Sequence, residues 1–175
     1  MKGKQLGALI GAIGGLMFVQ VNAGAVPSIL VLPVRVLGAV VFCIVLWRAA
    51  LRPPRNHAPE TAPSPAAWRV YWSSVSLGAL SIPIGAYLLN SVLHVPQLTV
   101  LWVVFVVGAH FLPFAGAFGE PVFQTLAWTL MVLAAAGAAL TLTVWPTAPG
   151  MVAVLAGFVL LGWVYQGSTR RPDSD

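Results

Sequence analysis

The chain contains 175 residues, of which 59% are hydrophobic and only 7% are charged. Soluble domains carry about 25% charged residues, so this composition excludes an ordinary soluble domain and indicates an integral membrane protein. The formal net charge is +5, but the basic residues cluster at the ends of apolar runs and form no basic stripe of the kind that binds nucleic acid. We therefore predict the lipid bilayer as the main partner, and no nucleic acid.

Six apolar runs approach the length of a membrane-spanning helix, which needs about 20 mostly apolar residues. They cover roughly residues 6–25, 29–47, 70–89, 98–118, 122–145 and 151–165. Strands of a membrane barrel would alternate over about 10 residues, and these runs do not alternate. The sequence predicts an all-α, polytopic bundle of six transmembrane helices that forms a single domain, 1–175.

Two polar segments separate or follow the apolar runs. Residues 48–69 are rich in proline, alanine and charge, which predicts an exposed linker because proline interrupts helices, and residues 166–175 form a polar tail. All lysines and arginines except Arg35 lie before the first run, in this linker or in the tail. Positive residues stay on the cytoplasmic side, so we expect both termini and the linker to face the cytoplasm of a bacterium.

The first apolar run has two interpretations. Two lysines, an apolar stretch and a small-residue segment that ends at Ala25 resemble a cleavable secretory signal, and cleavage would leave five spans. The glycines favour a retained helix, because a glycine at every fourth position lies on one face and lets another helix approach closely. They are Gly3, Gly7, Gly11 and Gly15. A glycine-rich run without a packing role is the alternative.

Two ionisable side chains lie inside apolar runs, where such groups are costly and often functional. Arg35 is six residues into the second run, roughly 9 Å from its outer end at 1.5 Å per residue. It either extends outward to the lipid headgroups or faces the bundle and binds an anion. His110 is twelve residues into the fourth run, near the bilayer centre. It is either a structural hydrogen-bonding group or a proton acceptor and ligand-binding group.

Three apolar runs contain an internal proline, at Pro33, Pro83 and Pro113. Each proline removes a backbone donor and leaves the carbonyl four residues earlier without its helical partner. We predict a helix kink at each proline. At Pro113 the exposed carbonyl would be that of Ala109, beside His110, which would create a small polar site within the membrane.

Several function classes lack the residues that they need. The last lysine is Lys4, so no buried lysine could hold retinal as a Schiff base. All four acidic residues lie outside the apolar runs, so no membrane-buried carboxylate pair is present for acid–base catalysis or sodium coordination. One cysteine and three separated histidines predict no disulfide, no metal site and no cofactor such as haem. The sequence identifies no catalytic residue, and an enzyme is the least favoured class.

The segment "GAHFLPFA", Gly108 to Ala115, resembles a motif of small six-helix bacterial membrane proteins of unknown function. In that group a Gly-x-His-Phe-x-Pro-Leu-Ala segment lies in a middle helix, and Phe114 here stands where leucine is usual. The resemblance covers this segment and the general layout of short helices with a basic inner linker. It implies the fold and the membrane location and points to His110, but it implies no activity.

Three functions remain open. The first is small-solute binding or transport at a site between the second, third and fourth helices. There Arg35, His110, Ser81 and Tyr87 would bind an anionic or carbonyl-bearing solute. The second is a non-catalytic membrane subunit, an assembly or sensor partner, in which Arg35 and His110 pair with another chain or a second copy. The third is a small membrane-embedded enzyme that uses His110.

Overall fold

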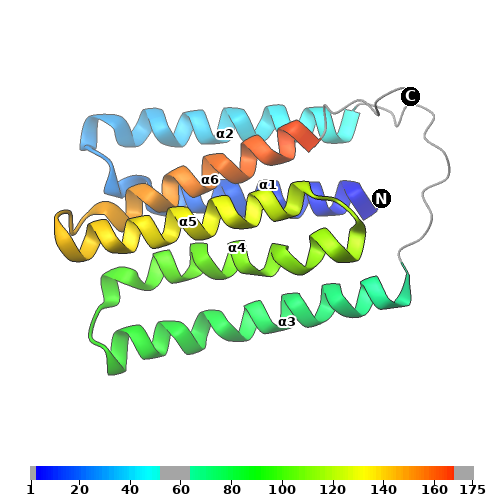
Figure 1. Ribbon diagram of the computed structural model, residues 1–175. Helices are drawn as coiled ribbons and strands as arrows, with labels where there is room; N and C mark the ends of the chain where they lie inside the picture. Colours follow the sequence, from blue (N-terminus) through cyan, green and yellow to red (C-terminus); the bar gives the residue numbers. More distant parts are fainter. Residues whose placement is uncertain (1–2, 52–63, 168–175) are drawn as a thin grey trace. The chain divides into compact units, whose positions relative to one another are not determined.

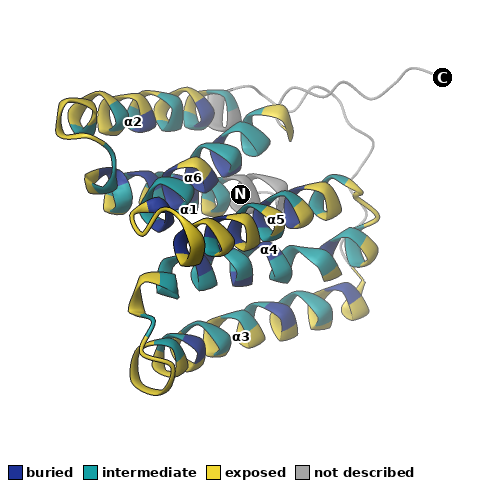
Figure 2. Cartoon of the chain, turned by 60° about the vertical axis from the view of Figure 1, so that its left-hand side comes forward, coloured by how far each residue is buried: buried dark blue, intermediate teal, exposed yellow. Residues whose placement is uncertain are grey.

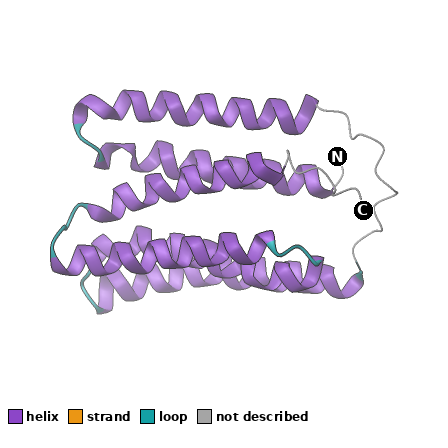
Figure 3. Ribbon diagram, turned by 45° about the horizontal axis from the view of Figure 1, so that its top comes forward, coloured by secondary structure: helices purple, strands orange, loops and turns teal. Residues whose placement is uncertain are grey.

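The computed structural model describes residues 3–51 and 64–167 of the chain, and it describes side chains for residues 9–48 and 64–167. The described residues form six α-helices and contain no strand (Figure 1, Figure 3), and short turns join all of them except α2 and α3. The all-α fold class predicted from the apolar runs is therefore confirmed for this part of the chain.

The helices follow the apolar runs of the sequence. They are α1 (Gly3–Asn22), α2 (Ser28–Leu51), α3 (Pro65–Tyr87), α4 (Thr99–Phe118), α5 (Val122–Thr143) and α6 (Ala148–Gly167). Two 3-10 turns, η1 (Ala23–Ala25) and η3 (Pro96–Leu98), precede α2 and α4. A π-helical turn, η2 (Leu88–Val92), continues α3.

Five of the described helical segments are long and apolar enough to cross a membrane. They are Ser28–Arg48, Pro65–Val92, Pro96–Phe118, Val122–Thr143 and Ala148–Gly167. The apolar part of α1 that the side-chain description covers is shorter, Leu9–Ala25. At 1.5 Å per residue, the five longer segments match the roughly 30 Å thickness of a bilayer core.

Two helices extend into the segment predicted to be a linker. α3 begins at Pro65, five residues before the predicted start, and α2 ends at Leu51. The Ser64 hydroxyl accepts a hydrogen bond from the backbone N–H of Ala67 at 3.1 Å, which caps α3. Proline is tolerated in the first helical position because its missing N–H has no partner there in any case. Proline at this point therefore belongs to the start of a helix. Separately, α6 is also longer than predicted, at Ala148–Gly167.

The helices group into two compact units. The first unit comprises Met1–Ala58 and Val154–Asp175, and so contains α1, α2 and most of α6. The second comprises Pro59–Ala153, and so contains α3, α4, α5 and the first residues of α6. Only 11% of the spanning residues of α2 and 6% of those of α3 are buried, as the yellow faces of these helices show (Figure 2). Such exposed apolar faces suit contact with lipid.

In the first unit, α1 and α6 approach each other through facing glycines. A Cβ atom added at Gly15 would lie 2.8 Å from the carbonyl oxygen of Gly157, and one added at Gly157 would lie 2.6 Å from that of Gly15. One turn earlier in α1, a Cβ atom added at Gly11 would lie 3.0 Å from Cγ2 of Val164. Gly3 and Gly7 lie in α1 before the residues with described contacts. Small residues therefore set the distance between these two helices.

A small apolar core connects all three helices of the first unit. Ala12 of α1, Val45 of α2 and Leu161 of α6 are 0%, 1% and 0% exposed. Gly38 of α2 lies against α1, because an added Cβ atom would be 2.7 Å from Cγ1 of Val19. The α1–α2 contact thus also depends on a residue without a side chain.

In the second unit, α4 packs between α3 and α5. A Cβ atom added at Gly108 of α4 would lie 3.0 Å from the carbonyl oxygen of Ala127 in α5. A Cβ atom added at Gly137 of α5 would lie 3.0 Å from Cδ2 of Leu101 in α4. Leu130 of α5 is fully buried. The face of α4 that contacts α3 differs from this one and carries large side chains.

We predict that Gly15→Ala destabilises the first unit, because the added methyl group would overlap the backbone of Gly157 and the side chain of Leu161. Overpacking of this kind costs about 1–3 kcal/mol. Gly14→Ala is the matched control, since a Cβ atom there would meet nothing within 4 Å. Thermal unfolding in detergent micelles, followed by circular dichroism, should show a lower Tm for Gly15→Ala only. Equal Tm values for the two variants would contradict the close glycine contact.

Candidate functional site

A stripe of small residues on α3 faces large side chains of α4. The stripe consists of Ser74, Gly78, Ser81 and Gly85, which share one helix face at intervals of four, three and four residues. Trp102 of α4 donates a hydrogen bond from its indole Nε1 to the carbonyl of Ser81 at 2.9 Å. Its ring occupies the space that a side chain at Gly85 would need. Small residues on one helix therefore accept a tryptophan from the other.

Ser74 contacts α4 beside its internal proline. The Ser74 hydroxyl donates a hydrogen bond to the backbone carbonyl of His110 at 2.8 Å, and Ser74 is only 8% exposed. Pro113 has no N–H to offer Ala109, so the hydrogen bonding of α4 is weakened at this level. Hydroxyls of neighbouring helices commonly compensate for proline in membrane helices. The sequence predicts the open carbonyl at Ala109, and the interhelical hydrogen bond forms one residue later.

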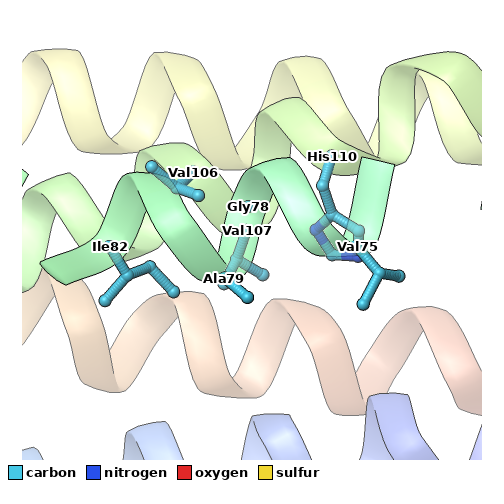
Figure 4. Close-up of a pocket in the computed structure, with 7 residues that line it drawn as sticks. All are labelled: Val75, Gly78, Ala79, Ile82, Val106, Val107 and His110. Atoms are coloured by element: carbon cyan, nitrogen blue, oxygen red, sulfur yellow. The ribbon is translucent and has the colours of Figure 1, made fainter. Parts of the chain in front are cut away.

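His110 lines a hollow of about 220 Å³ between α3 and α4 (Figure 4). Its other lining residues are Val75, Gly78, Ala79, Ile82, Val106 and Val107. The imidazole is therefore the single polar side chain among the seven residues that line this space. The hollow exists because Gly78 and Ala79 leave empty the volume that larger side chains at these positions would fill.

Aromatic rings surround the imidazole of His110. The ring centroids of His110 and Phe111 are 4.2 Å apart, and Phe114 meets the imidazole edge-on at 5.5 Å. Phe114 is 6% exposed and stacks on Tyr71 of α3 at 5.5 Å, while Phe111 stacks on Phe123 of α5 at 6.0 Å. Aromatic pairs of this geometry contribute about 0.5–1.5 kcal/mol each. Two rings of α4 therefore contact the imidazole, and these rings pack in turn against one ring of α3 and one ring of α5.

Sequence reasoning missed this aromatic cluster as a structural feature. The available signal was the spacing of Phe111, Phe114 and Phe118, at intervals of three and four residues, which puts them along one side of α4. Tyr71 and Phe123 could not be assigned to the cluster, because they lie on different helices whose neighbours the sequence does not specify.

His110 lies within an apolar span, where a charged imidazolium is disfavoured. A neutral imidazole carries one N–H donor and one acceptor nitrogen.

The residues predicted to form one site are distributed over both units. Arg35 is exposed on α2 of the first unit, whereas Ser81, Tyr87 and His110 belong to the second unit. Ser81 contributes its backbone carbonyl to Trp102, and Tyr87 is 65% exposed near the end of α3. Of the four residues, His110 alone lines the hollow.

The three prolines predicted to kink helices all lie inside helices. Pro33 is in α2, Pro83 in α3 and Pro113 in α4, and each helix continues past its proline. At Pro83 the indole of Trp102 bonds the carbonyl of Ser81 in the weakened turn, and at Pro113 the hydroxyl of Ser74 bonds that of His110. Pro113 is therefore the one that bears directly on the surroundings of His110.

A second polar cluster closes the turn between α3 and α4. Asn90 donates hydrogen bonds to the carbonyl of Ala86 at 2.6 Å and to the Thr99 hydroxyl at 2.9 Å. His94 adopts a positive φ of 55°, and its Nδ1 lies 3.3 Å from the Asn90 carbonyl. These contacts stabilise the π-helical turn. In the described ranges, no three His, Cys, Asp or Glu side chains are grouped closely enough to hold a metal ion.

The apolar helices of spanning length define this protein as a multi-pass helical membrane protein. No known family, no curated protein and no solved structure matches the chain. The contact between α3 and α4, with its hollow and its single imidazole, is the feature of the described residues that bears most directly on function.

We predict that Ser74→Ala loosens α4 near Pro113, because the His110 carbonyl loses its interhelical donor. Hydrogen bonds between membrane helices contribute about 0.6 kcal/mol on average and up to about 1.7 kcal/mol. Ser76→Ala is the matched control, since Ser76 is exposed on the same helix. Unfolding in increasing mole fractions of SDS should give a lower free energy for Ser74→Ala than for Ser76→Ala. Indistinguishable values would show that the hydrogen bond adds nothing to stability.

We also predict that Gly85→Ala displaces the indole of Trp102, because the added methyl group would occupy the position of that ring. Gly116→Ala in α4 is the control, since a Cβ atom there meets nothing within 4 Å. In ¹⁹F NMR of protein labelled with fluorotryptophan, the Trp102 signal should shift in Gly85→Ala and stay in place in Gly116→Ala. Trp102→Phe assigns the signal, and an unmoved signal in Gly85→Ala would refute the contact.

Proposed function

We propose that this protein binds a small, largely apolar solute that carries one hydroxyl group. The observation that carries this proposal is the hollow of about 220 Å³ with aliphatic walls and a single imidazole. The hollow is partly open and not enclosed, and a closed apolar cavity of about 150 Å³ is enough to bind benzene in an engineered protein. Pockets for drug-sized ligands begin at about 300 Å³. A single ring or a short chain therefore fits the space best.

The chemistry of His110 favours a solute that donates a hydrogen bond. A neutral imidazole carries one N–H donor and one acceptor nitrogen. A hydroxyl group can pair with either nitrogen, whereas a carbonyl group can pair only with the N–H. An anionic solute would find no cationic side chain among the lining residues. The hydroxyl-bearing solute thus replaces the anionic or carbonyl-bearing solute expected from the sequence.

The proposal includes an arrangement in a bacterial cytoplasmic membrane. In this arrangement α1 is a sixth span, which brings both termini and the segment between α2 and α3 to the cytoplasmic side. Support comes from the positions of the lysines and arginines, all of which except Arg35 lie at or beyond these helix ends. If the solute could also be released on both sides of the membrane, the protein would be a transporter. The hollow supports the binding step of such a process.

The test is ¹⁵N NMR of histidine-labelled protein in bilayers during titration with phenol and with toluene. These probes share one aromatic ring, but only phenol donates a hydrogen bond. We expect phenol to move the His110 ring signals and to bind roughly two- to tenfold more tightly than toluene, as a neutral hydrogen bond of about 0.5–1.5 kcal/mol would give. Methyl signals of labelled valine report the binding of toluene.

Three controls make the result specific to the hollow. Ala79→Leu fills the space and should abolish the response to both probes, and His110→Phe should remove the advantage of phenol. The ring signal of His94, which does not line the hollow, should stay in place. Equal affinities for phenol and toluene, or a phenol response that survives Ala79→Leu, would refute the proposed site.

A further inference from the structure

Arg35 is a permanent cation within a strongly apolar span. It does not line the hollow beside His110. The span Ser28–Arg48 has a mean hydropathy of 2.8. Arg35 is exposed, and so are its apolar neighbours Leu32, at 70%, and Val36, at 53%. A guanidinium does not lose its proton in a protein, so in lipid it must contact an anion or extend to the polar layer.

The described residues of the first unit include no anionic side chain. No aspartate or glutamate occurs among residues 1–59. Asp173 and Asp175 follow α6, and Tyr165 near the end of α6 has its ring 4.6 Å from the guanidinium carbon of Arg48. Arg48 is thirteen residues after Arg35, or about 20 Å along α2. The end of α6 is therefore near the opposite end of α2 from Arg35.

The backbone at Arg35 is held by α1 while its side chain is exposed. Gln20 of α1 donates a hydrogen bond from Nε2 to the Arg35 carbonyl at 2.9 Å. Three residues later, Gly38 packs against Val19 of α1. Helical side chains tilt toward the N-terminus of their helix, so the Arg35 side chain is directed toward Ser28, about 10 Å away along the axis. A span that begins at Ser28 places the polar layer of the bilayer at that end.

We propose that Arg35 binds the phosphate group of a membrane phospholipid, in the leaflet next to the N-terminal end of α2. The planar guanidinium matches two phosphate oxygens at once, and the exposed apolar side chains beside it contact the acyl chains. Gln20 is a positioning residue that fixes the backbone at this level. A second copy of the chain is a poorer partner, because no acidic residue lies in any of the apolar spans. The proposal is independent of the hollow in the second unit.

Native mass spectrometry of protein released from nanodiscs of phosphatidylcholine and phosphatidylglycerol tests this proposal. We expect Arg35→Gln to retain roughly tenfold less phospholipid than the wild type, since hydrogen bonds to charged groups are the stronger class. Arg35→Lys, which keeps the charge but loses the two-point geometry, should fall between them. Arg69→Gln is the matched control, because Arg69 is an exposed arginine near the start of α3 and should retain phospholipid normally.

Four outcomes would overturn the proposal. Retention by Arg35→Gln equal to that of the wild type would show that Arg35 holds no lipid. An equal loss in Arg69→Gln would reduce the effect to general charge attraction. Displacement of the lipid by excess inorganic phosphate would identify a site for a free anion. A change from dimer to monomer in Arg35→Gln would assign Arg35 to a contact between copies.

Discussion

Close approach of helix backbones through small residues is the constraint on which both units depend. Lipid is as apolar as the helix surfaces, so burial of apolar side chains cannot drive helices together, and packing contacts must do so. Gly15 and Gly157 meet backbone to backbone in the first unit, and Gly108 meets the Ala127 carbonyl in the second. Gly85, also in the second unit, leaves room for the ring of Trp102. Residues without a side chain at a few positions thus determine which helices can be neighbours.

The same constraint accounts for the hollow beside His110. Along the small-residue stripe of α3, the space at Gly85 is filled by Trp102, and the hydroxyl of Ser74 spans the gap to the His110 carbonyl. Between these two contacts, no side chain as large as that of Trp102 fills the space beside Gly78 and Ala79, and the hollow remains. The two contacts hold the helices at a fixed separation, so the space cannot close without loss of a hydrogen bond or displacement of the indole. The proposed binding site is therefore a consequence of the way in which this helix pair packs.

The sequence predicted the helices well and their neighbours poorly, for one physical reason. Length and hydropathy identify a spanning helix, and a histidine or arginine inside an apolar run is visible at once. Which face of a membrane helix packs against protein is not visible, because the lipid-facing and protein-facing sides are both apolar. The sequence therefore does not assign Tyr71 and Phe123 to the aromatic cluster around Phe114. The early start of α3 depends on the first-turn position of Pro65 and on the Ser64 cap, whereas the proline-rich composition predicts a linker there.

The different placements of Arg35 and His110 follow from their chemistry. Imidazole can be neutral, so it can lie among aromatic rings and aliphatic side chains. A guanidinium is always charged and has five donors to satisfy, and the span that carries it offers no acidic partner. The neutral group therefore suits recognition of an uncharged solute within the bilayer, whereas the permanent cation suits a phosphate at its edge. This difference in chemistry is why we propose a separate ligand for each of the two polar groups.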